Sequence, residues 1–300
     1  MKKSHKIDII YGIGLSSTSR KRVLRFVRLN LEKYDKNGSH NRGFLITTPN
    51  PEHVLMAVKN SKFKDIINRS DLAIPDGTGL VQAVKFLGLE TTKIPLVRIV
   101  VIFLQGIYVG LSTWFNKSWL EKEIRIIPGR VVFMDLIKLA NKKEWRVVLL
   151  GDDLQSAQKA AEVLKRSYKK VKLTAMTGPN LKDNGNLKTI KDREIERDVI
   201  STINSIKPHL VFVAFRAPIQ EIWSDKWLPK LNVGGMMVVG GTLDYVSGKA
   251  KLPPAWMEKA SLEWLYRLIT QPKRLRRILI AFPVFPAKMF WYKITKGGEK

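Results

Sequence analysis

Short apolar runs alternate with longer amphipathic stretches between about residues 43 and 250. Five runs are nearly continuous in apolar residues, which is typical of strands in a sheet covered on both faces: 44–47, 145–150, 171–176, 209–214 and 236–239. Five stretches have the spacing of a helix with one apolar face: 51–68, 132–141, 155–166, 193–206 and 220–231. This alternation predicts an α/β fold whose mostly parallel sheet carries helices on both faces.

The loops that follow the predicted strands are the places to search for a site, because open parallel sheets bind ligands at the carboxyl ends of their strands. The first loop reads TTPNPEHV and carries Thr48 and Asn50. Asn50 precedes Pro51, which indicates a helix N-cap and by itself can explain the asparagine. The free N–H groups of that helix start, with both side chains beside them, also suit a sugar or a phosphate.

The second loop, LAIPDGTGL, places Asp76 and Gly77 in a turn between two apolar runs. Asp and Gly are common turn residues for conformational reasons alone, so a structural role is the first interpretation. The alternative is a carboxylate that accepts a proton from a sugar hydroxyl within hydrogen-bond reach. The residues of this loop leave both interpretations open.

Three later loops carry further candidates. Gly151 ends the run RVVLLG and is followed by two acids. This loop is a poor phosphate cradle compared with a true glycine-rich loop. The loop VAFRAPIQEIW places Gln220 and Glu221 where a helix begins. In VVGGTLD, Gly240 and Gly241 directly follow a strand, where the lack of side chains lets a ligand approach the backbone.

Residues 95–115, PLVRIVVIFLQGIYVGLSTWF, break this alternation. The segment is about as long as a membrane-spanning helix, but it carries Arg98 and Gln105. Tryptophans and lysines in and around it favour a segment that lies in or dips into the membrane interface. A buried core helix or a contact between subunits is the alternative, and we weigh it equally.

The tail from Trp256 onward joins basic clusters to aromatic and aliphatic residues. Pro283 and Pro286 argue against a continuous spanning helix, and the composition favours a basic amphipathic tail that docks on an anionic membrane surface. We therefore predict two parts. Residues 1–252 form an α/β core with an apolar insertion at about 88–124, and residues 253–300 form a helical, basic, membrane-proximal appendage.

Composition narrows the classes of protein that remain. The 300 residues carry a formal net charge of +27, which attracts nucleic acid, anionic lipid headgroups or phosphate-bearing substrates. The N-terminus lacks the apolar region of a signal peptide, which predicts a cytoplasmic protein. There is no cysteine for a disulfide, and no metal site is expected, because the four histidines lack metal-ligand spacing: His5, His40, His53 and His209.

Taken together, the motifs resemble those of the WecG/TagA/CpsF glycosyltransferases. The resemblance covers roughly residues 43–277 and is interrupted near 88–124. It rests on segments that occur in the order and spacing of that family: TPNPEH, DLAIPDGTGLVQA, IPGR, RVVLLG, APIQEIW, VVGGTLDYVSGKAK and PPAWMEKASLEWLYRLITQPKRLRR. Each motif alone is weak, whereas the ordered set is specific.

The resemblance implies a Rossmann-like core of the GT-E type and an inverting glycosyltransferase that needs no metal or other cofactor. Such an enzyme moves an N-acetylhexosamine-type sugar, such as N-acetylmannosamine, from a UDP-sugar to a polyprenyl-diphosphate-linked sugar in the synthesis of cell-surface polysaccharides. It is expected to bind peripherally at the inner face of the cell membrane. The resemblance does not decide whether the protein forms a homo-oligomer. Nucleic acid is not an expected partner.

The resemblance also assigns roles to residues. Asp76 is the implied general base, and Thr48, Asn50 and Gln220 complete the implied catalytic set. Three tail arginines at the family's spacing are implied to stabilise the departing diphosphate and to help hold the enzyme at the membrane: Arg267, Arg274 and Arg277. The other implied substrate-binding residues are Gly77, Arg130, Gly151, Glu221, Gly240 and Gly241.

Several positions depart from the family's pattern. Val131 stands where many relatives have an acid, and Asp152 stands where a second glycine is usual. Ile219 replaces a lysine, with Arg216 as a candidate substitute for its charge. Because acids beside a pyrophosphate are unfavourable, these changes leave the identity of the donor sugar undecided. Two alternatives also remain: a catalytically inactive relative that binds UDP-sugar or lipid, and a basic protein that binds nucleic acid.

Overall fold

The computed structural model describes residues 6–37, 43–152, 155–272 and 275–296. Its centre is a six-stranded sheet in which all neighbouring strands are parallel, in the order β4-β3-β8-β7-β5-β6. The strands are β3 (Phe44–Thr47), β4 (Leu72–Ala73), β5 (Arg146–Gly151), β6 (Lys172–Thr177), β7 (Leu210–Ala214) and β8 (Gly235–Val238). The predicted α/β fold class is confirmed, and the short β4 is the strand that the apolar pattern did not predict.

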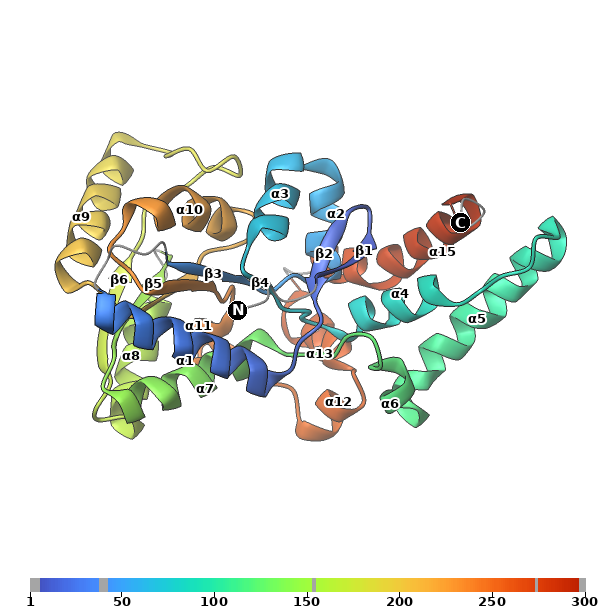
Figure 1. The fold of residues 1–300 in the computed structure, drawn as a ribbon, viewed down its shortest axis with the longest axis horizontal. Coiled ribbons are helices and arrows are strands. Elements are labelled where there is room, and N and C mark those ends of the chain that lie inside the picture. Colours follow the sequence, from blue (N-terminus) through green and yellow to red (C-terminus); the bar gives the residue numbers. More distant parts are fainter. Residues whose placement is uncertain (1–5, 38–42, 153–154, 273–274, 297–300) are drawn as a thin grey trace.

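Helices cover both faces of this sheet (Figure 1). In β5, Val147 and Leu149 pack in one core cluster, whereas Val148 and Leu150 pack in another. Successive side chains of a strand point to opposite faces, so a sheet buried on both sides needs nearly continuous apolar strands. The first cluster includes side chains of α1 (Arg20–Asn37), α7 (Gly129–Lys143) and α8 (Ser156–Ser167), and the second includes α3 (Ser61–Arg69), α9 (Ile190–Ile206) and α10 (Ile219–Trp227).

Two of the predicted helices are interrupted. The single helix predicted over 51–68 is wrong, because α2 (Pro51–Lys59) ends before Asn60 and α3 begins after it. The side-chain oxygen of Asn60 accepts the N–H of Phe63 at 3.0 Å, so this residue caps α3 and competes with helix continuation. The stretch predicted over 220–231 ends its α-helix at Trp227 and continues as a 3₁₀ turn, η2 (Leu228–Lys230).

The N-terminal part carries elements that the alternation did not predict. Strands β1 (Lys6–Ile10) and β2 (Ile13–Ser16) form an antiparallel hairpin. Helix α1 follows and buries Val23, Val27 and Leu31 against the sheet. Their four-residue spacing is a helical signal, but the many basic residues between them obscure the apolar face.

The segment 95–115 is one helix, α5 (Pro95–Phe115), long and apolar enough to cross a membrane by length and composition. Arg98 and Gln105 turn toward the protein. Arg98 Nη2 donates to the carbonyl of Lys293 at 2.9 Å, and Gln105 Nε2 donates to the carbonyl of Glu90 at 2.6 Å. Only 17% of its most apolar 18-residue window is buried, so the alternative of a buried core helix is wrong.

The tail is a series of short helices. Phe282 has an extended conformation beside Pro283 and interrupts the helix, as the prolines predicted. The last helix packs on α5 and buries Phe285 and Met289 in a third core cluster, so both helices form the same end of the molecule (Figure 1). The remaining elements are α4 (Thr78–Gly88), α6 (Lys117–Leu120), α11 (Thr242–Val246), α12 (Ala255–Lys259), α13 (Glu263–Thr270), α14 (Leu275–Leu279), η4 (Ile280–Val284) and α15 (Phe285–Lys296).

Candidate active site

A cleft of about 1160 Å³ opens at the carboxyl edge of the sheet. Loops that follow β3, β4, β5, β7 and β8 line it, together with α5 and tail helices. The structure brings most of the predicted site residues into this cleft: Thr48, Asn50, Asp76, Gly77, Arg130, Gly151, Gln220, Gly240, Gly241, Arg267 and Arg277. Glu221 is not part of the lining that the described residues form, and Arg274 lies outside the described residues. The chemical roles of these residues stay predictions.

Asp76 lies in a turn that is tied to the first loop. Its backbone N–H donates to the carbonyl of Pro49 at 2.9 Å. Gly77 follows with a φ of 114°, a conformation that favours glycine, and it is the N-cap of α4. The structural interpretation of this turn is therefore correct for Gly77, and the same turn places Asp76 in the lining of the cleft.

The surroundings of Asp76 make its carboxylate more basic than usual. Burial raises the pKa of Asp76 to about 6, and the Glu263 carboxylate acts in the same direction. Arg267, Arg130 and the backbone N–H of Gly129 oppose the shift. The group is therefore mostly ionised at pH 7 and holds a proton better than an ordinary aspartate, which suits a general base.

Thr48 and Asn50 lie on the first loop. Thr48 is buried against the start of α7, where a Cβ added to Gly129 would come within 3.1 Å of the Thr48 Cγ2 atom. Asn50 is the N-cap of α2, because its Oδ1 accepts the N–H of His53 at 2.9 Å. The capping interpretation of Asn50 is confirmed, and its contact with substrate stays a prediction.

Gln220 is held by a short hydrogen-bond network. Its Oε1 accepts the N–H of Gly240 at 3.0 Å, and its Nε2 donates to Oε1 of Glu221 at 2.9 Å. Glu221 is 1% exposed, and burial raises its pKa to about 7. Its Oε2 atom has no hydrogen-bond partner in the described part of the chain. Glu221 therefore lies behind Gln220 and not in the lining of the cleft, and its predicted contact with substrate stays a prediction.

The glycines of the cleft serve two different purposes. A Cβ on Gly151 would lie 2.8 Å from the Cβ of Ala157, so glycine here lets α8 approach the end of β5 closely. Gly240 has a φ of 50°, and a Cβ there would meet no heavy atom of the described residues within 4 Å. Gly241 is the N-cap of α11. Gly240 thus presents open backbone to the cleft and Gly241 lines the cleft beside it, whereas Gly151 serves packing.

Two of the cleft arginines are bound to acids that the sequence did not single out. Arg130 Nη1 donates to both carboxylate oxygens of Glu263, at 3.0 and 3.2 Å, and Arg130 also contacts Glu258. Arg267 contacts the same Glu263. The four-residue spacing of Glu263 and Arg267 signals that pair, but Arg130 lies 133 residues from Glu263, so only the fold reveals the shared carboxylate.

Other charges of the cleft are paired as well. Arg277 Nε donates to both carboxylate oxygens of Glu52, at 2.8 and 2.9 Å. Arg216, the candidate substitute cation, forms a 2.6 Å ion pair with Asp183, and both side chains are mostly exposed. Asp152 lines the cleft, so this departure from the family pattern faces the site. A bound diphosphate has to compete with these carboxylates for the arginines.

The charged lining also bears on metal binding. Among the described residues, no group of three or more histidine, aspartate and glutamate side chains is placed to hold a metal ion. The positive groups that the described lining offers are Lys117, Arg130, Arg216, Arg267 and Arg277. Independence from metal stays a prediction.

The fold and the cleft define a Rossmann-like α/β protein. At the carboxyl edge of its sheet, the cleft contains Asp76, whose pKa is raised, together with several arginines. The model of the glycosyl transferase WecG/TagA/CpsF family matches residues 9–105 and 96–299, and the chain belongs to that family. It is therefore a glycosyltransferase, and the family predicted from the motifs is confirmed.

Three similar proteins carry the name N-acetylglucosaminyldiphosphoundecaprenol N-acetyl-beta-D-mannosaminyltransferase. The Staphylococcus aureus (strain NCTC 8325 / PS 47) protein is 28% identical over 295 residues, which cover 98% of this chain and 94% of the relative. The Bacillus subtilis (strain 168) protein is 27% identical over 237 residues, covering 79% and 75%. The Bacillus spizizenii protein is 26% identical over 239 residues, covering 80% and 76%.

The family match divides into two parts that meet within α5. The interruption predicted near residues 88–124 includes this point. The residues around Asp76 and those of the tail lie in different parts of the match, on either side of α5. The two matched ranges overlap at residues 96–105, so the family match is divided at α5.

Proposed function

We propose that the chain transfers an N-acetylhexosamine-type sugar, such as N-acetylmannosamine, from a UDP-sugar to a sugar on a polyprenyl diphosphate. The observation that carries this proposal is that one cleft contains Asp76, with its raised pKa, and the arginines Arg130, Arg267 and Arg277. The name of the relatives supports the acceptor, because those enzymes act on N-acetylglucosaminyldiphosphoundecaprenol. The product enters the synthesis of a cell-surface polysaccharide.

The proposed chemistry needs one base and a set of positive charges. Asp76 accepts the proton of the acceptor hydroxyl while the hydroxyl oxygen forms a bond to the anomeric carbon of the donor. The bond from that carbon to the UDP oxygen breaks on the opposite face, so the configuration inverts. UDP leaves with the electron pair, and the arginines stabilise its negative charge through their paired N–H groups.

The other predicted residues orient the two substrates. Thr48 and Asn50 belong to the loop that accepts the backbone N–H of Asp76, so they lie beside the base. Gln220 holds Gly240 in place through the N–H of that glycine, and we assign the donor diphosphate to this open backbone. The tail arginines provide the charge that a divalent cation supplies in other transferases, which is why we expect no metal.

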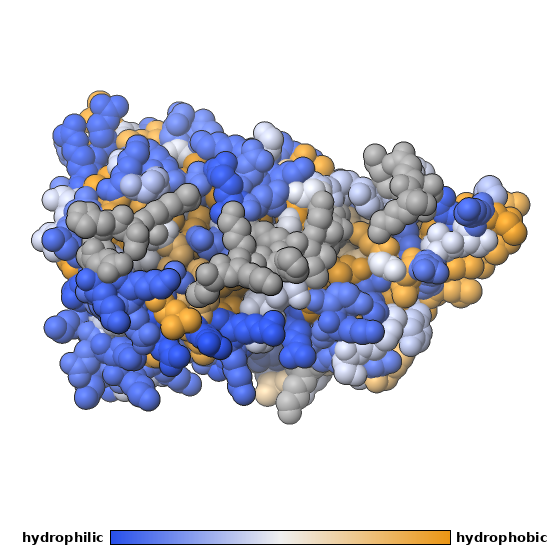
Figure 2. All heavy atoms as spheres, in the orientation of Figure 1, coloured by the Kyte–Doolittle hydropathy of each residue, from blue (hydrophilic) through white to orange (hydrophobic). Residues whose placement is uncertain are grey.

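We further propose that the protein acts peripherally at the inner face of the cell membrane. Helix α5 and the tail expose large apolar side chains, among them Leu96 (79%), Trp114 (63%) and Trp291 (67%). Figure 2 shows apolar surface at the end of the molecule that α5 forms, and hydrophilic surface over much of the rest. Apolar side chains next to basic residues suit an anionic bilayer, where a lipid-linked acceptor resides.

A panel of UDP-sugars tested against a synthetic lipid-linked N-acetylglucosamine diphosphate decides between this function and its alternative. We expect transfer from UDP-N-acetylmannosamine, with equal amounts of product and UDP, and with the same rate when EDTA is present. The alternative is an inactive relative that binds UDP-sugar, which Asp152 in the cleft and the missing acid at Val131 favour. Binding of UDP-sugars without transfer from any of them would support that alternative.

A further inference from the structure

The cleft has two sides of different chemistry. The side at the strand ends carries Asp76 and the arginines described above. The side away from the sheet is largely apolar, although Thr113 of α5 and Lys117 of α6 also line it. Its apolar residues come from two elements far apart in the sequence: Ile107, Gly110, Leu111 and Trp114 from α5, and Ile278, Ala281, Phe282 and Pro286 from the tail.

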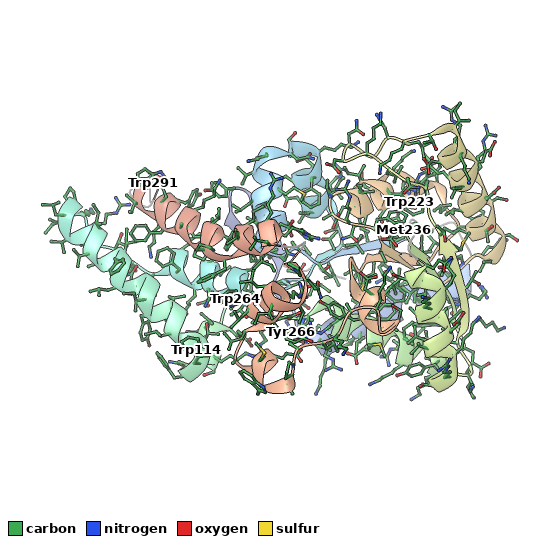
Figure 3. All side chains as sticks on the ribbon, turned by 180° about the vertical axis from the view of Figure 1, so that it is seen from behind. Trp114, Trp223, Met236, Trp264, Tyr266 and Trp291 are labelled. Atoms are coloured by element: carbon green, nitrogen blue, oxygen red, sulfur yellow. The ribbon has the colours of Figure 1, made fainter. Side chains whose placement is uncertain are left out.

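Helix α5 turns one face toward the cleft. Apart from Thr113, its cleft residues recur at three- and four-residue spacing, which places them on one side of the helix. Ile102 and Val109 lie on another side and are buried in the third core cluster with residues of α4 and α15. Trp114 Nε1 donates to the carbonyl of Ala260 at 2.9 Å, which joins α5 to the tail beside the cleft. Figure 3 shows Trp114 at the end of α5 opposite to the end that lies beside Trp291 of α15.

Several apolar side chains of this wall are exposed, although Ile278 is buried. Ile107 is 46% exposed, Leu111 is 42% exposed and Phe282 is 47% exposed. Neighbouring apolar side chains left in solvent are typical of a surface that binds an apolar ligand. The cleft, at about 1160 Å³, also exceeds the range of about 300–1,000 Å³ that is usual for a single small ligand. It therefore has room for a second, apolar molecule beside a nucleotide sugar.

The apolar wall joins the charged side directly. Arg277 and Ile278 are neighbours on α14, and both line the cleft. Across the cleft, the Asp76 turn leads into Gly79, where an added Cβ would lie 3.9 Å from Phe285 of α15. A molecule that consists of a sugar, a diphosphate and an apolar chain has its groups in this same order.

We propose that the wall formed by α5 and the segment from α14 to α15 binds the first isoprene units of the lipid-linked acceptor. The acceptor diphosphate then lies at Arg277, which leaves Arg130 and Arg267 for the departing UDP. The acceptor hydroxyl reaches Asp76. This inference rests on the proposed function. It gives α5, where the family match divides, a role in binding the acceptor in addition to contact with the membrane surface.

Gly110 offers a sharp test. A Cβ on Gly110 would meet no heavy atom of the described residues within 4 Å, so this position accepts a side chain. Gly110→Trp therefore places an indole in the cleft and removes a glycine from a helix. Gly88→Trp is the matched control, because Gly88 is also a helical glycine with open space around it but does not line the cleft. Both variants are compared with wild type for thermal unfolding, so that a folding defect is seen directly.

The first measurement compares two detergent-free acceptors that share N-acetylglucosamine diphosphate and carry either a farnesyl or an ethyl group. We expect wild type to favour the farnesyl acceptor at least tenfold in kcat/KM, Gly110→Trp to reduce that preference to less than twofold, and Gly88→Trp to keep it. Equal use of both acceptors by wild type, or an unchanged preference in Gly110→Trp, would overturn the inference.

A second measurement works without turnover and separates this inference from the proposed function. Dansyl-labelled farnesyl diphosphate is titrated with protein and followed by fluorescence anisotropy in the absence of vesicles. We expect at least tenfold weaker binding to Gly110→Trp than to wild type or Gly88→Trp, and displacement by unlabelled farnesyl diphosphate. Equal displacement by dodecylphosphocholine would assign the wall to bilayer lipid and contradict the proposal. If no sugar is transferred to either acceptor, the proposed function fails and this measurement still decides the inference.

Discussion

At the scale of single residues, the position that makes Asp76 useful as a base also costs stability. Its carboxylate is withdrawn from water and lies close to Glu263, so its ionised form is disfavoured. Arg130 and Arg267 compensate only in part, because both also interact with Glu263. Two separate predictions follow from this arrangement, one on activity and one on stability.

Asp76→Asn should lower kcat/KM by about 10²–10⁴-fold, because an amide cannot accept the proton of the acceptor hydroxyl. In wild type, kcat/KM should fall about tenfold per pH unit below pH 6, because Asp76, with a pKa of about 6, becomes protonated there. Steady-state rates between pH 5 and 8 measure both effects. Binding of UDP-sugar by Asp76→Asn is the control for folding, and full turnover in that variant would disprove the assignment.

The same substitution should stabilise the fold at neutral pH by about 1–3 kcal/mol. The pKa of Asp76 is raised from 3.8 to about 6, so the wild type loses stability as pH rises through this interval and keeps that loss above it. Below pH 3.8 both forms are uncharged and the difference should vanish. Urea unfolding of both proteins across pH 3.5 to 8 tests this, and equal stability at pH 7 would argue that the site is well solvated.

Glu221 provides a test of positioning without contact to substrate. Glu221→Gln keeps an oxygen that can accept the Gln220 Nε2 hydrogen and removes a buried charge, so we expect kcat/KM within a few-fold of wild type. Glu221→Ala leaves the Gln220 amide without that partner and should raise KM for the UDP-sugar about tenfold or more. Steady-state kinetics of the two variants make the comparison, and unchanged circular dichroism shows that both are folded. Equal losses in both variants would instead point to a direct role of the carboxylate.

At the scale of elements, local patterns predicted where helices and strands lie, and their interruptions came from single residues. The strands were predictable because both faces of the sheet are buried, and the breaks near Asn60 and Phe282 follow from a cap and a proline. The role of α5 was not predictable. Arg98 and Gln105 argued against a membrane helix in the sequence, whereas the structure uses them to attach α5 to the protein.

The apolar face of α5 continues beyond the cleft toward Pro95 and should anchor the protein to vesicles. Four exposed side chains that do not line the cleft are replaced together by glutamine: Leu96, Val100, Phe103 and Leu104. We expect flotation with anionic liposomes to fall several-fold, because apolar area that enters the bilayer interface is lost. The control is Ile190→Gln on α9, a side chain that is 79% exposed on another part of the surface. Unchanged flotation of the fourfold variant would rule out a membrane contact at α5.

At the scale of the whole molecule, a net charge of +27 alone would attract both an anionic bilayer and nucleic acid. The exposed apolar surface favours the bilayer. We expect flotation with anionic vesicles to persist in part at 0.5 M salt, because the apolar contact is not screened. Binding to duplex or single-stranded DNA should disappear over the same range, as counterion release requires. DNA binding in the nanomolar range at 0.15 M salt would revive the nucleic-acid alternative.

The sequence by itself determined what depends on near neighbours in the chain. Apolar runs gave the strands, the order of the motifs gave the family, and the residues at Asn50 and Gly77 gave a helix cap and a turn. Such features follow from backbone conformation and short-range hydrogen bonds, which a local pattern records.

Only the tertiary structure decided how distant charges meet. It placed Glu263 between Arg130 and Arg267, buried Glu221 behind Gln220, and set α5 beside the tail as one wall of the cleft. The physical reason is that burial and Coulomb interactions depend on distances in space, which residues more than a hundred positions apart do not reveal in the chain. The LAIPDGTGL turn could be recognised from its letters, but the raised pKa of Asp76 exists only inside the folded cleft.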